Sequence, residues 1–327
     1  MSSMARFAET PILDLDEDST AEFREAVLAG LSRHQKQIPS KFFYDAAGSR
    51  LFDQICTLPE YYPTRTETEI LRANAGELAD IVPPEAVLVE YGSGASVKVR
   101  ILLEALRRPG GYVPIDISRD HLRLAASALA ADYPRLTVRP VCADFARPMS
   151  LPRNMPAGPR IGFFPGSTIG NLHPPDAACL LIRFARQLGA DGWLLIGVDL
   201  KKDSRVLHAA YNDSAGVTAA FNRNLLVRIN RELDGRFDLE SFDHSAFWND
   251  KDGRIEMHLV SAVSQTGRVS GRAFRFAAGE SIHTENSYKY TVEEFRRLAA
   301  SAGFRPTAVW SDAERLFSVH LLRVGGI

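Results

Sequence analysis

The chain has 327 residues, 45% of them hydrophobic and 24% charged, with a formal net charge of −1. This length predicts two domains, or one large domain with an insertion, and a core that is stable without disulfides or metals. The balanced charge gives no general attraction for nucleic acid. No apolar run approaches the roughly 18 residues that a membrane span requires.

Cysteine usage and the first residues both bear on the compartment. Cys56, Cys142 and Cys179 are widely spaced and form no C-x-x-C pair. This predicts a reducing environment and argues against a zinc site. Residues 1–20 lack a basic region followed by an apolar stretch, so we expect no signal peptide. A cytoplasmic protein is the expectation.

In the first two thirds of the chain, predicted helices are followed by a region in which predicted strands alternate with helices. A helix is predicted over 19–35, and a long helix begins near Thr64–Thr66. Short apolar runs then alternate with helical periodicity. In chain order we predict a strand ending at 91, a helix over 96–108, a strand over 111–118, a helix over 119–134, strands within 136–145 and 160–172, a helix over 174–189 and a strand over 192–200. This alternation predicts an α/β fold with a doubly wound parallel sheet.

The pattern changes after Leu200. An amphipathic helix is predicted over 217–233, and the strand-like segments 254–263 and 271–282 suggest an antiparallel hairpin with its turn at Gln265–Arg268. A T-x-x-E capping box at Thr291 starts another helix. The segment 317–324 is predicted to be a last strand that rejoins the main sheet. Residues 201–289 therefore interrupt the parallel-sheet domain.

A glycine turn follows the first predicted strand of that sheet. Gly92-Ser93-Gly94 lets the backbone approach a ligand closely, although a plain strand–helix turn is an alternative. Val97 occupies the third glycine position of the dinucleotide fingerprint, which disfavours a nicotinamide cofactor. A nicotinamide oxidoreductase is therefore a weaker hypothesis.

Three further residues follow the next two strands. Asp116 lies 22 positions after Gly94, where a carboxylate can accept ribose hydroxyls. Asp144 and Phe145 suit an adenine, with an acceptor for its amine and a flat face for its ring. Alternatively, Asp144 is a helix N-cap and Phe145 a core residue. Together these residues resemble class I S-adenosylmethionine-dependent methyltransferases.

Longer stretches between about Lys41 and Arg323 carry a more specific resemblance. They are "YDAAGSRLFDQICTLPEYYPTRTETEIL", "FFPGSTIGNL", "GVTAAFNRNLLVRINREL", "RIEMHLVS" and "HTENSYKY". They resemble the histidine-specific Nα-methyltransferases of ergothioneine biosynthesis. That family trimethylates the α-amino group of L-histidine to hercynine with S-adenosylmethionine, which leaves as S-adenosylhomocysteine.

The resemblance also implies an architecture. A Rossmann-like class I methyltransferase domain would comprise residues 61–200 and 290–327. A second, α+β substrate-binding domain would comprise residues 1–60 and 201–289, that is, the N-terminal segment and the late insertion. We expect a monomer with no metal, no nucleic-acid partner and no membrane attachment.

Site residues carry over from the matched motifs. Glu285 and Ser287 would hold the imidazole, with Tyr44 near it. Asn171, Tyr61 and Tyr211 would hold the amino and carboxylate groups, and so act as the catalytic residues, with Tyr62 as a register alternative to Tyr61. The expected cofactor contacts are Gly92, Gly94, Lys98, Asp116, Asp144 and Phe145.

The Glu285/Ser287 pair also has a physical interpretation. A buried imidazole needs a partner for each nitrogen, and residues i and i+2 of an extended segment point to one face. The alternative is structural: Glu285 caps the next helix and Ser287 bonds backbone. His244, His258, His283 and Lys289 are expected to be structural or surface groups. A methyltransferase for another amino acid or small amine, or a non-catalytic S-adenosylmethionine-binding protein, would contain the same cofactor residues.

Overall fold

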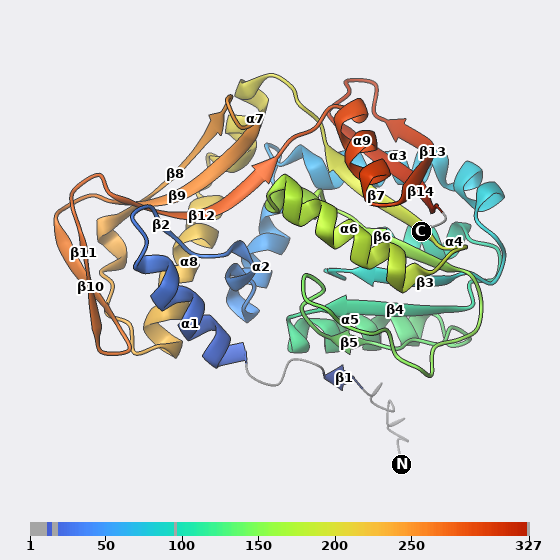
Figure 1. Ribbon diagram of the computed structural model, residues 1–327, viewed down its shortest axis with the longest axis horizontal. Helices are drawn as coiled ribbons and strands as arrows, with labels where there is room; N and C mark the ends of the chain where they lie inside the picture. Colours follow the sequence, from blue (N-terminus) through green and yellow to red (C-terminus); the bar gives the residue numbers. More distant parts are fainter. Residues whose placement is uncertain (1–11, 15–18, 95–96, 326–327) are drawn as a thin grey trace, which may run out of the picture.

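The computed structural model describes residues 12–14, 19–94 and 97–325. Figure 1 shows two lobes, one around a large sheet and the other around smaller sheets. Most of the segment considered for a signal peptide lies outside the described residues. No helix in the described part of the chain has the length and apolar character that crossing a membrane requires.

The larger lobe contains a mixed sheet. Across the sheet, the strands in the described residues are β1 (Leu13–Asp14), β5 (Val141–Cys142), β4 (Gly111–Asp116), β3 (Val87–Tyr91), β6 (Arg160–Phe164), β7 (Trp193–Asp199), β14 (Phe317–Val324) and β13 (Phe304–Ser311). Neighbours from β1 to β7 are parallel, whereas β14 is antiparallel to both β7 and β13. The α/β prediction and the return of the tail strand to the main sheet are confirmed.

Helices cover both faces of this sheet. Val87 and Val89 belong to one apolar core and Leu88 to the other, because alternate strand residues face opposite sides. On the first side lie α6 (Pro174–Leu188) and α9 (Val292–Ser301), and on the second α3 (Tyr62–Ile81), α4 (Val97–Ala105) and α5 (Arg119–Asp132). Strands buried on both faces appear in the sequence as continuous apolar runs, which explains why they were predictable.

The second lobe joins the N-terminal segment to the insertion. Its sheet contains β2 (Lys36–Gln37), β12 (Ser281–Tyr288), β9 (Arg254–Ser261) and β8 (Phe242–Asn249), and its helices are α1 (Ser19–Leu31), α2 (Ala46–Ile55), α7 (Ser204–Tyr211) and α8 (Val217–Glu232), with short 3-10 turns η1 (Ser40–Phe43) and η3 (Leu239–Ser241). Phe23, Phe43, Phe221 and Leu259 lie in one core, so distant segments fold together. The domain boundaries given above remain a prediction.

The predicted hairpin in the insertion is wrong. The supposed turn belongs to a strand, β10 (Gln265–Val269), which pairs with β11 (Arg272–Phe276). The turn is Ser270–Gly271, with φ values of 47° and 78°, as a two-residue hairpin loop requires. β9 pairs with β8 and β12 instead.

Several boundaries also differ. α3 starts at Tyr62, earlier than predicted, with Pro63 in its first turn. The strand predicted within 136–145 is only β5, two residues long, directly after Pro140, which has no N–H for a ladder. The described part of α4 runs from Val97 to Ala105, so its predicted end at 108 is too late, whereas its predicted start at 96 lies outside the described residues. The elements α2, α7, β8 and β13 were not predicted.

Candidate active site

A glycine turn at the carboxyl end of β3 borders the larger of two cavities. Gly92 and Gly94 have φ values of +79° and +41°, which side-chain-bearing residues adopt only with strain. A Cβ atom at Gly92 would lie 3.6 Å from the ring of Phe145. The bare backbone can therefore contact a ligand at this turn.

All predicted cofactor contacts line this larger cavity. They are Gly92, Gly94, Lys98, Asp116, Asp144 and Phe145. Most of them follow β3, β4 and β5, which are neighbours in the sheet, and Lys98 lies in the first turn of α4. This is the edge at which open α/β sheets bind ligands.

Asp116 ends β4 and is partly buried. One of its oxygens accepts a hydrogen bond from the Ser118 backbone N–H at 2.8 Å. Burial raises the pKa of Asp116, and hydrogen bonds from backbone N–H groups, that of Ser118 first, oppose part of the rise. The oriented carboxyl group offers acceptors for ribose hydroxyls.

Asp144 and Phe145 lie beside it. Asp144 accepts hydrogen bonds from the Ala146 N–H at 2.8 Å and from Lys41 Nζ at 2.7 Å. No described helix begins at Asp144, so its interpretation as an N-cap is wrong. The partly buried ring of Phe145 packs against Phe164, with centroids 5.3 Å apart, so Phe145 belongs to both the core and the cavity wall.

Lys98 makes a contact that the sequence did not indicate. It forms an ion pair with Glu67 of α3, which also accepts a hydrogen bond from the Gly166 N–H at 2.9 Å. Glu67 is fully buried. It therefore links the helix after the glycine turn to the loop that leads to Asn171.

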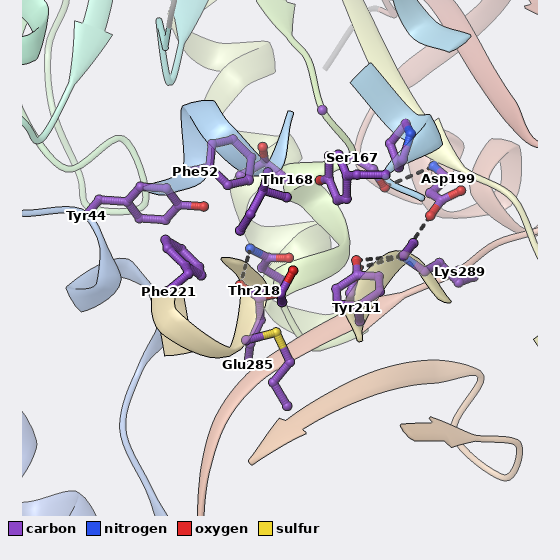
Figure 2. A pocket seen from close by; sticks show the side chains of 18 residues that line it. Tyr44, Phe52, Ser167, Thr168, Asp199, Tyr211, Thr218, Phe221, Glu285 and Lys289 are labelled. Atoms are coloured by element: carbon purple, nitrogen blue, oxygen red, sulfur yellow. Dashed lines mark hydrogen bonds and ion pairs between the residues drawn. The ribbon is translucent and has the colours of Figure 1, made fainter. Parts of the chain in front are cut away.

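The smaller cavity shares part of its wall with the larger one. All predicted substrate-binding residues line it, namely Tyr44, Tyr61, Asn171, Tyr211, Glu285 and Ser287. Figure 2 labels Tyr44, Tyr211 and Glu285 among them. Tyr44, Tyr61, Asn171 and Glu285 line the larger cavity as well. The two cavities therefore adjoin, and these four predicted residues are part of their common wall.

Glu285 and Ser287 reach the smaller cavity from β12. They pair with Met257 and Ile255 of β9, and Met257 also lines the cavity. The register shifts at Thr284, whose hydroxyl lies 2.7 Å from Asn222 Oδ1 and 3.0 Å from the Met257 carbonyl oxygen. Such an irregularity redirects the residues that follow it.

Glu285 is partly buried and lines both cavities. Burial raises its pKa to about 7, and the charge of Lys289 opposes part of this rise. Asn171 Nδ2 lies 3.5 Å from Glu285 Oε2. Helix α9 is capped by Thr291 and Glu294, so the alternative in which Glu285 caps it is wrong.

Asn171 reaches the cavities from a strained loop. Gly166 and Ser167 have φ values of 76° and 59°, and the loop continues into η2 (Thr168–Asn171). The Ser167 hydroxyl accepts a hydrogen bond from the Asp199 N–H at 2.9 Å, which fixes the loop to the end of β7. Strain of this kind persists only where the surrounding structure holds it.

Tyrosines from both lobes complete the wall. Burial raises the pKa values of Tyr44, Tyr61 and Tyr211, so all three hydroxyl groups stay protonated. Tyr62 lines neither cavity, because its hydroxyl contacts Asp199 at 2.7 Å. Between the two register alternatives, Tyr61 is the one at the cavity.

Known proteins with this sequence pattern identify the family. Residues 23–324 match the protein family described as "Histidine-specific methyltransferase, SAM-dependent". The chain belongs to this family. The resemblance stated from the motifs is confirmed, and the enzyme is an S-adenosylmethionine-dependent methyltransferase.

Relatives of this methyltransferase cover nearly its whole length. It is 45% identical over 311 residues to a histidine N-alpha-methyltransferase of Mycolicibacterium smegmatis, covering 93% of this chain and 96% of that protein. It is 43% identical to a protein of the same name from Mycobacterium tuberculosis, with coverages of 91% and 94%. An ergothioneine biosynthesis protein 1 of Neurospora crassa is 32% identical over 88% of this chain and 33% of that longer protein.

The larger cavity of the methyltransferase suits S-adenosylmethionine. Its wall combines carboxyl groups that can accept hydrogen bonds from hydroxyls and an amine, a flat aromatic ring and bare glycine backbone. Two buried side-chain oxygens on its wall, Ser93 Oγ and Asn286 Oδ1, have no hydrogen-bond partner among the described residues. Buried polar groups are normally paired, so these two indicate a bound ligand or water.

Lys289 of the methyltransferase was expected to be structural or at the surface, and its place in the cavity wall was missed. It is only 2% exposed and forms an ion pair with Asp199 at 2.8 Å (Figure 2). Ser287 accepts hydrogen bonds from Tyr211 and Lys289, so the alternative in which Ser287 bonds backbone is wrong. The i, i+2, i+4 spacing of Glu285, Ser287 and Lys289 was the available signal.

A histidine cluster lies on the neighbouring part of the sheet. The potential ligand atoms of Glu256, His258 and His283 lie within 4.8 Å of one another. However, the centroids of the two stacked imidazole rings are 4.6 Å apart and their planes differ by 11°, so their in-plane lone pairs lie in separate, nearly parallel planes. Both His258 nitrogens also have hydrogen-bond partners, in Ser281 and Glu256. This arrangement does not favour a metal centre, and a metal-free enzyme remains our prediction.

Proposed function

We propose that this methyltransferase transfers methyl groups from S-adenosylmethionine to the α-amino nitrogen of L-histidine, in three rounds, and forms hercynine for ergothioneine biosynthesis. The observation that carries the proposal is the Glu285/Ser287 pair in a cavity that adjoins the cofactor cleft. The names of the bacterial relatives support it. The proposal includes a monomer that acts without metal, nucleic acid or membrane.

The imidazole-binding step rests on hydrogen-bond matching. The Glu285 carboxylate accepts the N–H of the ring, and the Ser287 hydroxyl pairs with the other nitrogen. Apolar side chains such as Phe221 and Met257 surround these groups. A ligand without ring nitrogens leaves both polar groups unpaired, which discriminates by about 10⁴-fold or more in sites of this kind.

The amino group must be held where the two cavities adjoin. Asn171 and Tyr61 line both, so they can bind the amino and carboxylate groups of histidine at this boundary, and Tyr211 can assist from the inner wall. Neutral oxygens orient an amine and still tolerate the methyl groups that accumulate on it. Such alignment contributes roughly 7–11 kcal/mol to rate enhancement.

The cofactor would be held by Asp116, Asp144, Phe145 and the glycine turn, with Lys98 beside them. Bound there, S-adenosylmethionine supplies a methyl group activated by a positive sulfur. The amine must be neutral to react, and an α-amino group is mostly protonated near pH 7, since even a peptide's terminal amine has a pKa of about 8. Loss of its proton to water suffices, so no dedicated general base is required.

Product mass tests this proposal directly. We expect L-histidine and S-adenosylmethionine to yield a product that is heavier by three methyl groups, with a chelator present or absent. A panel of the other amino acids should give little product. Equal methylation of leucine would favour a broader amine methyltransferase. Cofactor binding without any product would favour a non-catalytic protein, and absorbance changes with NAD(P)H would favour an oxidoreductase.

A further inference from the structure

Lys289 uses all of its hydrogen-bond donors inside the protein. Its ammonium group lies 2.8 Å from Asp199 Oδ2, 2.7 Å from Ser287 Oγ and 3.0 Å from Tyr211 Oη. Burial by itself would lower its pKa, but the Asp199 carboxylate outweighs this effect and the net shift is upward. Lys289 therefore stays charged and donates to all three groups.

The direction of the remaining hydrogen bonds follows from this arrangement. Tyr211 Oη accepts from Lys289, so its own proton is free to go to Ser287 Oγ, 2.7 Å away. Ser287 Oγ then accepts two hydrogen bonds, from Lys289 and Tyr211, and a hydroxyl oxygen has only two acceptor lone pairs. The Ser287 proton must point away from both, and Ser287 lines the substrate cavity.

We propose that Lys289 is a positioning residue that makes Ser287 an obligatory hydrogen-bond donor, so that the site binds only the neutral imidazole ring. This inference rests on the proposed function and adds the protonation state and orientation of the substrate. The ring presents its lone pair to Ser287 and its N–H to the Glu285 carboxylate. An imidazolium has two N–H groups, and one of them would face the Ser287 proton.

The charged groups around Lys289 are consistent with one set of protonation states. Asp199 is paired with Lys202 as well as Lys289 and is almost fully buried. Burial acts to raise its pKa, but the two lysines lower it overall, so Asp199 remains a carboxylate. Both Asp199 oxygens already accept hydrogen bonds, from Tyr62, Lys202 and Lys289. Among the described residues Ser287 Oγ is only an acceptor, from Tyr211 and Lys289, so its proton remains available to the substrate.

Nitrogen NMR of bound substrate tests the inference without any mutation. Ring-labelled [¹⁵N]histidine is bound to the full-length enzyme with S-adenosylhomocysteine at about pH 6.5, where roughly half of free imidazole rings carry two protons. We expect one protonated nitrogen and one hydrogen-bonded lone-pair nitrogen in the bound ring. Two protonated nitrogens would overturn the inference. Absence of saturable histidine binding would instead overturn the proposed function.

A mutant cycle tests the route through Ser287. Lys289→Met should weaken histidine binding by at least tenfold, measured by calorimetry at about pH 8, with S-adenosylhomocysteine affinity within twofold. In a Ser287→Ala background the same substitution should change histidine affinity by less than threefold, because Lys289 acts through that hydroxyl. Additive effects would contradict a positioning role.

Lys202 supplies the matched control. It also bonds Asp199, at 2.5 Å, but its other contacts are Tyr62 and the Leu200 carbonyl, not Ser287. Lys202→Met should therefore leave histidine affinity within threefold of the parent. An equal loss for Lys202→Met and Lys289→Met would mean that both lysines only stabilise Asp199, and the inference would fail. If Lys289→Met does not fold, the NMR result decides.

Discussion

Asn171 lies where the two cavities adjoin, and its amide nitrogen is 3.5 Å from Glu285 Oε2. A single side chain can thus contact both the reacting end of the substrate and the group proposed to hold its ring. The loop that carries Asn171 is tied to β7 through Ser167 and to α3 through Glu67. At the scale of residues, the site depends on side chains whose positions are fixed by other buried polar groups.

Asn171→Ala should slow methylation by at least tenfold, because the amine loses the group that aligns it with the methyl donor. S-adenosylhomocysteine affinity should stay within threefold, since Asn171 lines the cofactor cavity but is not one of the proposed cofactor contacts. Single-turnover rates at saturating histidine, with calorimetry as the control, check this. A rate within twofold of the parent would refute the role.

Glu285 makes substrate binding dependent on pH. Its pKa of about 7 means that the carboxylate dominates above pH 7 and the neutral acid below it. Because the ring N–H needs the carboxylate, histidine affinity should fall by at least tenfold from about pH 8 to pH 6. Glu285→Gln should flatten this fall to about fourfold, the part due to protonation of the imidazole itself. Calorimetry across this range checks both values, and an unchanged profile in the variant would contradict the assignment.

At the scale of elements, the strands that the sequence predicted correctly are those buried on both faces. Strands β3, β4, β6 and β7 are covered on both faces, so they appear as apolar runs and were predicted. β10 presents alternating exposed residues around Gly267, and its strand character comes only from pairing with β11. The local sequence of a strand gives little indication of such pairing, because the pairing depends on a neighbouring strand from another part of the chain.

The residues of the candidate site also differ in how well the sequence predicted them. Asp116 and Asp144 were predictable because they follow buried strands of a fold that binds ligands at that edge. Glu285 and Ser287 were assigned through family resemblance, since polar residues on a strand have many structural uses. Lys289 was missed because burial of a lysine becomes evident only when Asp199, 90 positions earlier in the chain, is seen beside it.

Helix α9 offers a prediction at this scale. Thr291 Oγ1 accepts the Glu294 N–H at 3.1 Å, and Glu294 accepts the Thr291 N–H at 2.7 Å. Thr291→Ala removes one bond of this capping box and should cost about 1 kcal/mol. Amide hydrogen exchange in the first turns of α9 should then become about fivefold faster. Thr291→Ser keeps the acceptor and should exchange like the parent, whereas equal acceleration in both variants would exclude a capping effect.

At the scale of the whole molecule, both lobes build each cavity. Lys41, from the N-terminal segment, bonds Asp144 in the cofactor cavity and also pairs with Glu22 of α1. Conversely, Asp199 at the end of β7 in the larger lobe forms an ion pair with Lys289, which follows β12 of the second lobe. Neither lobe can rearrange without disturbing the cavity wall contributed by the other.

This shared construction predicts coupled binding of the two ligands. The residues that line both cavities are Tyr44, Phe52, Tyr61, Gly166, Thr168, Asn171 and Glu285. A ligand in either cavity should order these side chains and lower the cost of filling the other. We expect S-adenosylhomocysteine to raise histidine affinity at least fivefold, and histidine to raise S-adenosylhomocysteine affinity by the same factor, as linkage requires.

Calorimetric titration of each ligand, with and without the other at saturation, measures how much each ligand raises the affinity for the other. L-Leucine serves as the control, because it has the amino and carboxylate groups but no ring to engage Glu285, and it should produce less than a twofold change. Affinities for both ligands that stay within twofold in every titration would mean that the common wall is rigid. The two cavities would then be independent sites that merely adjoin.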